Sequence, residues 1–232
     1  MKKIGLLIFV GCLVVGLVCA NMFSFGKTSA KFFNFEMNFG GVKGSGNVAT
    51  DSRSVGEFHG IQVGGVYQME VTAGKEYSVE VTADDNILPL IRTEVSGGIL
   101  KISSSEHVSP KNVMKIKVTA PDIDSLNVSG VANVSLTGVK NAALSIDSSG
   151  ASKVHVDGTT AKLTVDVSGA TSIDADGLTA ENATVGASGA SSVSVNVTGN
   201  LKSNASGASK IRYSGTTNVE SKTTGAGSVS QK

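Results

Sequence analysis

Apolar and polar side chains alternate along much of the chain after residue 57. The stretch FHGIQVGGVYQMEVTAG, residues 58–74, alternates on both sides of a Gly64-Gly65 corner. The same period of two recurs in three shorter stretches: YSVEVTA (77–83), GGILKISS (97–104) and MKIKVTAP (114–121). Alternation bounded by glycine and other turn residues is typical of β-strands with one buried face. The pattern therefore predicts a strand-rich region over residues 51–120.

One segment interrupts this alternation. Residues 84–95, DDNILPLIRTEV, space their apolar side chains as a helical turn does. We predict that Asp84 or Asp85 caps this turn, because Asp is a favoured residue at helix starts. The two acids could instead bind a cation. The apolar side of the turn consists of Ile87, Leu88 and Ile91.

A short phrase recurs every 18 to 20 residues from residue 129 onward. Its first position is serine, at Ser129, Ser149, Ser168, Ser188 and Ser206, with Thr224 in the sixth copy. Glycine always follows, at Gly130, Gly150, Gly169, Gly189, Gly207 and Gly225. Next comes Val131 in the first copy and then alanine, at Ala151, Ala170, Ala190, Ala208 and Ala226. Three positions further on stands a β-branched residue, at Val134, Val154, Ile173, Val193, Ile211 and Val229.

This repeat predicts an all-β fold in which residues 121–232 form a parallel, right-handed β-helix, or solenoid, of about six rungs. Stacking would place each repeated position in a column, with neighbours about 4.8 Å apart. The β-branched column would form the interior, the glycine column a corner with positive φ, and the alanine column a narrow inside corner. The strand-rich region 51–120 would cap one end, because an open rung exposes unpaired backbone.

Outward positions of the predicted solenoid carry the candidate chemistry. Asp147 and Asp166, two residues before the repeat serine, would stack on adjacent rungs about 5 Å apart. Paired acids at that distance suit glycoside cleavage or a cation site, although solvated turn-side acids are the simpler interpretation. Other acids that could enlarge this patch are Asp157, Asp174 and Asp176. The basic groups expected on the outer surface are Lys153, His155, Lys210 and Arg212.

The first twenty residues, MKKIGLLIFVGCLVVGLVCA, have the pattern of an export signal. Two lysines precede an apolar run, and small residues suit cleavage after Ala20. The alternative is a retained membrane anchor, because residues 4–23 are nearly long enough to span a bilayer. Both cysteines, Cys12 and Cys19, lie in this segment, so the cleaved chain would have neither disulfides nor thiolate metal sites.

Residues 21–50 form a predicted spacer that is rich in phenylalanine. An extended strand over FFNFEMNFGG, residues 32–41, would place its apolar residues on one face. We expect this strand to cap one end of the fold, and the alternative is a strip that contacts a membrane or a partner. The glycine-rich stretch GVKGSGN, residues 41–47, follows as a linker. The apolar face of the strand consists of Phe33, Phe35, Met37 and Phe39.

Charge and composition exclude some classes of function. The formal net charge is +1 and no basic cluster with interleaved aromatic residues occurs, so we predict no nucleic-acid partner. His59, His107 and His155 are scattered, without the spacing of metal ligands. We therefore predict no metal, no cofactor and no catalytic residue.

Three features resemble the head-GIN domain of putative auto-transporter adhesins: the stretch FHGIQVGGVYQMEVTAG, the stretch VEVTADDNILPLIRTEVSGGILKIS, and the later SGA repeats. The similarity runs from about Ser52 to the C-terminus. It implies a bacterial envelope protein with a β-helical fold. No catalytic residues come with this family.

These observations predict a non-catalytic exported protein of the cell envelope, in the periplasm, on the outer-membrane surface or outside the cell. Its solenoid surface would contact an envelope or extracellular glycan or protein. Membrane contact is expected only through residues 4–20, if they are retained. The alternatives are an exported polysaccharide-active enzyme that uses Asp147 and Asp166, and a self-assembling homo-oligomeric scaffold.

Overall fold

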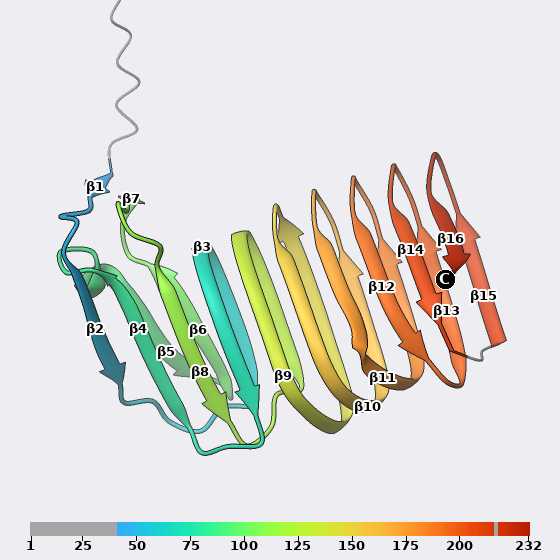
Figure 1. Ribbon diagram of the computed structural model, residues 1–232, viewed down its shortest axis with the longest axis horizontal. Helices are drawn as coiled ribbons and strands as arrows, with labels where there is room; N and C mark the ends of the chain where they lie inside the picture. The colour runs from blue at the N-terminus through green and yellow to red at the C-terminus, as the bar shows by residue number, and fades with distance from the viewer. Residues whose placement is uncertain (1–40, 216–217) are drawn as a thin grey trace, which may run out of the picture. The chain divides into compact units, whose positions relative to one another are not determined.

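The structure, a computed structural model, describes residues 41–215 and 218–232. The predicted signal or anchor at residues 1–20 and most of the predicted spacer at 21–50 lie outside the described residues. The described residues belong to one compact unit, Gly40–Lys232. They form β-strands and one short 3-10 helix, so the predicted all-β class is confirmed (Figure 1).

The part of the chain before residue 125 forms eight strands. They are β1 (Val42–Lys43), β2 (Val48–Arg53), β3 (Gly60–Ala73), β4 (Ser78–Asp84), β5 (Ile91–Ser96), β6 (Ile99–Ser104), β7 (Val108–Ser109) and β8 (Lys115–Ala120). β3 is the central strand, because it pairs in parallel with β6, with β8 and with the first strand of the repeat region. The predicted strand-rich character of this region is confirmed.

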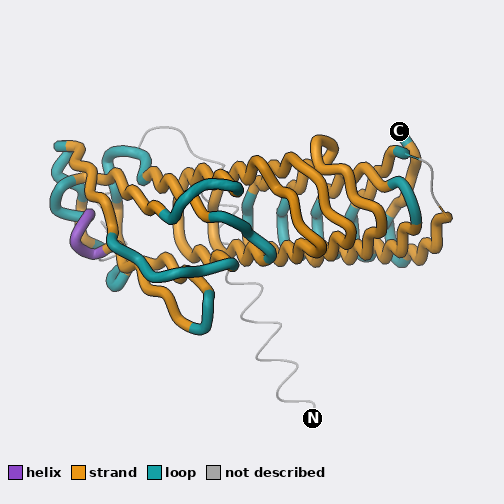
Figure 2. The backbone as a smooth tube through the Cα atoms, turned by 90° about the horizontal axis from the view of Figure 1, so that it is seen from below, coloured by secondary structure: helices purple, strands orange, loops and turns teal. Residues whose placement is uncertain are grey.

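The repeat region forms eight further strands. They are β9 (Ser125–Gly150), β10 (Lys153–Val167), β11 (Ser172–Ala187), β12 (Ser192–Val197), β13 (Asn200–Ala205), β14 (Lys210–Ser214), β15 (Asn218–Thr223) and β16 (Ser228–Gln231). Every pairing between them is parallel. β11 pairs with β12 through its first half and with β13 through its second half. The strands therefore form two layers joined by turns (Figure 2).

We call the layer that contains β12, β14 and β16 the first layer, and the layer that contains β13 and β15 the second layer. The β-branched column lies in the first layer, where Val154 is the register partner of both Val134 and Ile173. The column continues through Val193 and Ile211. These five side chains are at most 2% exposed, so the predicted apolar column is confirmed for them, whereas Val229 in the last copy is only partly buried.

The structure corrects the predicted parallel arrangement, because the 14-stranded sheet is mixed. β4 pairs with both β2 and β8 in the antiparallel sense. β5 and β6 form an antiparallel pair joined by Gly97 and Gly98, which have φ of 61° and 74°. A short connection of this kind reverses the chain and places antiparallel strands side by side, whereas parallel neighbours require longer connections. All the antiparallel pairs among the described residues lie before residue 125, in the strand-rich region.

The repeat also begins one copy earlier than the sequence predicted. Gly65 is the register partner of Gly130, Val66 of Val131, and Met69 of Val134. The Gly64-Gly65-Val66 segment thus occupies the place that Ser-Gly-Ala occupies in later copies. Glycine in the serine position conceals this copy in the sequence.

The corner of each repeat unit is formed by glycine with positive φ, as predicted. Gly169 has φ of 81°, and a Cβ there would lie 2.5 Å from the carbonyl oxygen of Gly150. The alanine column is not inside this corner, however, because Ala151 and Ala170 are exposed. The glycine conformation turns the chain so that the inward position comes one residue later. That buried column consists of Ala132, Ser152, Thr171, Ser191 and Ser209.

The predicted helical turn is a 3-10 helix, η1 (Leu88–Leu90), without a side-chain cap. Ile87, Leu88 and Ile91 are buried as predicted. The capping prediction is wrong, because the buried carboxylate of Asp84 accepts hydrogen bonds elsewhere. Its donors are the amides of Gly46 (3.0 Å), Lys111 (2.8 Å) and Asn112 (3.2 Å), together with Asn112 Nδ2 (2.6 Å). Asp85 contacts the hydroxyl of Ser45 instead.

Candidate ligand-binding surfaces

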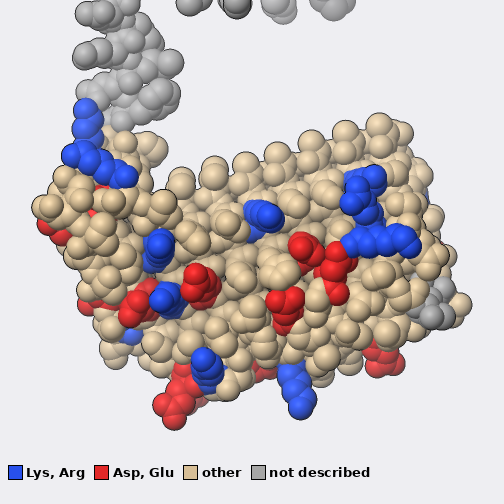
Figure 3. Space-filling model, in the orientation of Figure 1, with Lys and Arg blue, Asp and Glu red and all other residues tan. Residues whose placement is uncertain are grey.

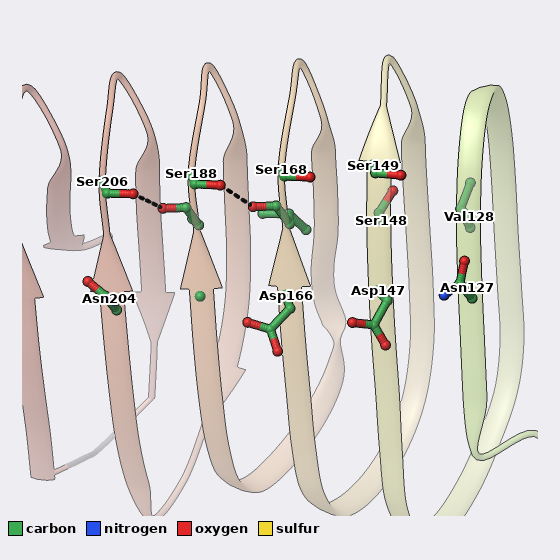
Figure 4. A pocket seen from close by; sticks show the side chains of 13 residues that line it. Asn127, Val128, Asp147, Ser148, Ser149, Asp166, Ser168, Ser188, Asn204 and Ser206 are labelled. Atoms are coloured by element: carbon green, nitrogen blue, oxygen red, sulfur yellow. Dashed lines mark hydrogen bonds between the residues drawn. The ribbon is translucent and has the colours of Figure 1, made fainter.

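The second layer presents straight columns of polar side chains (Figure 4). Asp147 on β9 and Asp166 on β10 are direct register partners. Neighbouring parallel strands lie about 4.8 Å apart, so the two carboxylates are adjacent. The column continues through Gly186 and Asn204. The structure thus brings together the two acids that the repeat pattern indicated.

A groove of about 390 Å³ lies beside this column. Its opposite side is the serine column of the repeat, Ser149, Ser168, Ser188 and Ser206 (Figure 4). The hydroxyl of Ser188 donates to the carbonyl of Val167 at 3.2 Å, and that of Ser206 to the carbonyl of Ala187 at 3.5 Å. These hydroxyl oxygens keep lone pairs with which they can accept hydrogen bonds from a ligand.

The electrostatics of the groove are set by its two acids. Burial, and secondly the charge of Asp166, raise the pKa of Asp147 above its ordinary value. Among the described residues no Lys, Arg or His lines this groove. Lys202 and Lys222 line an adjoining hollow that also includes Asp166. The groove is therefore rich in hydrogen-bond acceptors and suits a ligand that donates, such as a hydroxyl-rich one.

His155 lies between two carboxylates on the first layer. Its Nε2 is 2.9 Å from Asp157 Oδ2, and its Nδ1 is 3.3 Å from Asp174 Oδ2. A protonated imidazole can donate to both. Asp176 contacts Lys232. None of these three acids lines the groove beside Asp147 and Asp166, because Asp157 and Asp174 lie at His155 and Asp176 lies at Lys232.

The remaining basic candidates form two separate groups on the first layer. Lys210 and Arg212 lie on β14 and are both exposed. Lys153 lies on β10, and β11 and β12 separate it from β14. On the face that Figure 3 displays, a basic group lies beside an acidic group toward the C-terminal end, whereas basic and acidic side chains are interspersed at the N-terminal end. The four predicted basic residues therefore share a layer but not a single site.

The sequence analysis missed an apolar hollow near the corner of β3 and β9. It is lined by three exposed valines, Val66, Val113 and Val131. The sequence feature that could have indicated this hollow is Val131, which stands where later copies have alanine. Val66 occupies the same position in the unrecognised first copy.

Two further properties of the described residues concern metal binding and membrane-spanning helices. Over residues 41–215 and 218–232, no group of three or more His, Cys, Asp or Glu side chains is arranged to hold a metal ion. In the same residues, no helix has the length and hydropathy needed to cross a membrane.

The stacked β-architecture and its polar columns define a class of repeat proteins with extended outer surfaces. The chain belongs to the family described as putative auto-transporter adhesin, head GIN domain, whose model matches residues 57–217. None of the curated proteins compared matches this chain.

Several bacterial proteins of known structure resemble this one. A putative adhesin from Bacteroides fragilis NCTC 9343 has a TM-score of 0.65 at 22% identity, covering 83% of this chain and 100% of its own. A putative adhesin from Parabacteroides merdae ATCC 43184 has a TM-score of 0.49 at 18% identity, covering 82% of this chain and 98% of its own. A putative lipid binding protein from Parabacteroides distasonis ATCC 8503 has a TM-score of 0.47 at 21% identity, covering 82% and 99%. The first of these similarities supports the fold.

Proposed function

We propose that this protein is a non-catalytic adhesion module whose outer columns bind a glycan or protein of the cell envelope or its surroundings. The observation that carries this proposal is the registered stacking of outward polar residues over successive units, as at Asp147, Asp166 and Asn204. A repetitive surface suits a repetitive ligand, because each strand step of about 4.8 Å presents the same contacts again. Membership of an adhesin family supports the same function.

The proposal includes the arrangement of the strand-rich region and of the repeat region. We assign residues 121–232 as a right-handed β-solenoid and residues 51–120 as the strand-rich part that covers one end. The parallel pairing from β9 to β16 supports the solenoid, and the crossover rule supports its hand.

Export is the second component of the proposal. The apolar segment 1–20 would direct the chain to the periplasm, the outer-membrane surface or the exterior, as a cleaved signal or as an anchor, and residues 21–50 would act as a spacer. Mass spectrometry of the mature N-terminus from fractionated cells tests this. A chain that begins at Asn21 is a free exported protein, an intact Met1 on a membrane-bound chain is an anchored one, and an intact Met1 in the cytosol contradicts export.

The basic groups of the first layer provide a direct test of adhesion. We expect Lys210→Gln with Arg212→Gln to lower retention of the purified protein on immobilised envelope material at least several-fold, because both exposed cations face outward from β14. Retention is measured against Lys101→Gln with Lys117→Gln, two exposed lysines of the strand-rich region. Equal retention of the two double variants and the unaltered protein would argue against a role for this face.

A second candidate function rests on the Asp147–Asp166 pair. The raised pKa of Asp147 suits a general acid, and the adjacent Asp166 could serve as the second carboxylate of a retaining glycosidase. If so, Asp147→Asn with Asp166→Asn abolishes release of reducing ends from a glycan that the unaltered protein cleaves. Asp51→Asn, outside the groove, is the matched control. Turnover that survives the double substitution removes this function.

A further inference from the structure

An apolar hollow lies where the segment before β8 approaches the corner formed by β3 and β9. Its volume is about 680 Å³, within the range of small-molecule sites. Six large apolar side chains are exposed among the described residues, and three of them line this hollow. They are Val66, Val113 and Val131, at 57%, 62% and 55% exposure. Isolated exposed valines are ordinary, but a cluster of this kind marks a binding surface.

The walls of the hollow come from separate parts of the chain. Val66 and Val131 are register partners on β3 and β9, and Val113 belongs to the segment between β7 and β8. The apolar surface continues into Ala151 and Ala170, which stack through backbone hydrogen bonds of successive units. The result is a linear apolar track that starts in a hollow. An extended hydrocarbon chain fits such a track.

The charge around the hollow has a single sign. Lys111 and Lys153 line it, and within residues 41–215 and 218–232 no Asp or Glu does so. Lys111 Nζ donates to the carbonyl of Ser45 at 3.1 Å. Lys153 has no carboxylate within ion-pair distance among the described residues. A free cation beside an apolar track is complementary to a ligand that is apolar along its length and anionic at one end.

We propose that this hollow binds a long-chain fatty acid. The hydrocarbon chain lies against Val66, Val113 and Val131 and extends toward Ala151 and Ala170. The carboxylate pairs with Lys153. This hollow shares no lining residue with the groove beside Asp147 and Asp166.

Calorimetric titration of the full chain with dodecanoate, below the concentration at which it forms micelles, tests the proposal. We expect saturable binding of about one dodecanoate per chain. Val113→Ser and Val131→Ser should each weaken it roughly tenfold, because each removes apolar contact area from the hollow. Val48→Ser is the matched control, since Val48 is 58% exposed and lies on β2 outside the hollow.

The head group is tested with two further ligands and one lysine. Dodecyl maltoside has the same chain with a neutral head, and butyrate has the same head with a short chain. Lys153→Gln should weaken dodecanoate binding several-fold and leave dodecyl maltoside unchanged, whereas Lys140→Gln, another exposed lysine, should change neither.

Three results would overturn the proposal. The first is dodecanoate binding that is absent, or equally tight in Val113→Ser, Val131→Ser and the unaltered protein. The second is an equal loss in Val48→Ser. The third is sedimentation showing that the unaltered chain self-associates through this hollow and that Val131→Ser makes it monomeric, which would assign the surface to a second copy of the chain.

Discussion

Asp84 joins three segments that are far apart in the sequence. Burial acts to raise its pKa, but hydrogen bonds from Asn112, Lys111 and Gly46 outweigh burial, and the pKa lies below its ordinary value. A depressed carboxylate pKa stabilises the fold above the pKa of the unfolded chain. That contribution is lost as the pH falls through the folded-state pKa.

Asp84→Asn is therefore expected to lower Tm by several degrees at neutral pH. Asn has the same shape as Asp but no charge. Its side-chain NH2 group is itself a donor, so it would face the N–H groups that the Asp84 carboxylate accepts from. The difference from the unaltered protein should shrink on acidification, because Asp84 itself then becomes protonated. Thermal melts followed by circular dichroism at pH 7 and at about pH 3 measure both effects. Asp85→Asn, an exposed neighbour, is the control, and an equal loss in both variants would contradict the assignment.

The sequence predicted that Asp84 starts a helical turn, since Asp before an apolar run usually does. Its actual partners lie 38 and 27 residues away, at Gly46 and Lys111, and no local pattern reveals them. The prediction that the alanine column lies inside the corner was wrong for a related reason. Alternation is a local rule, and the positive φ at the preceding glycine shifts the inward position by one residue. Residue identity alone does not show that shift.

At the scale of the element, the repeated corner depends on glycine for two reasons. The backbone there has φ between 70° and 96° in the six copies from Gly130 to Gly225, a region that L side chains rarely adopt. The corners also stack directly, since the amide of Ala170 donates to the carbonyl of Gly150 at 2.8 Å. A side chain at this position therefore meets both torsional strain and the backbone of the preceding unit.

Gly169→Ala should reduce the free energy of unfolding by about 2–4 kcal/mol, from strain at positive φ together with the 2.5 Å approach to Gly150. Gly56→Ala is the matched control, because nothing lies within 4 Å of a Cβ there and its φ is not positive. Urea denaturation measures the two values. Similar stability of both variants would show that the corner tolerates a side chain.

The β-branched column was predictable because a fixed period fixes which residues meet, whatever their distance in the chain. Val154, Ile173 and Val193 share one column for that reason. The mixed sheet was not predictable in the same way. Whether β4 lies parallel or antiparallel to β8 depends on connection geometry, and no period relates these strands. The apolar hollow could not be predicted for the same reason, because the sequence does not show where the segment around Val113 lies relative to Val131.

At the scale of the whole molecule, each unit of the repeat pairs only with its neighbours. β10 pairs with β9 and β11, and β11 pairs also with β12 and β13; over residues 125–215 and 218–232 no pairing skips a unit. Stability is then a sum of unit and interface contributions, as in other repeat proteins.

Deletion of residues 170–189, one whole unit, should leave a folded protein with a modestly lower Tm. The new junction joins Gly169 to Ala190 and restores the repeat phrase, so Val154 can pair with Val193. Deletion of residues 170–179 should abolish cooperative unfolding, because it removes the first-layer strand and leaves the second-layer strand without its connection. Circular dichroism melts of both chains decide this, and equal damage from the two deletions would show that the units are not interchangeable.

The corner stacking of Gly130, Gly150 and Gly169 has a consequence for how such proteins change over time. Duplication of a single unit displaces everything beyond it by about 4.8 Å and keeps all side-chain columns aligned. Internal duplication therefore lengthens the molecule without requiring any new kind of contact between units. The length of the molecule therefore changes in equal steps, one for each repeat unit. Selection can adjust that length by adding or removing units.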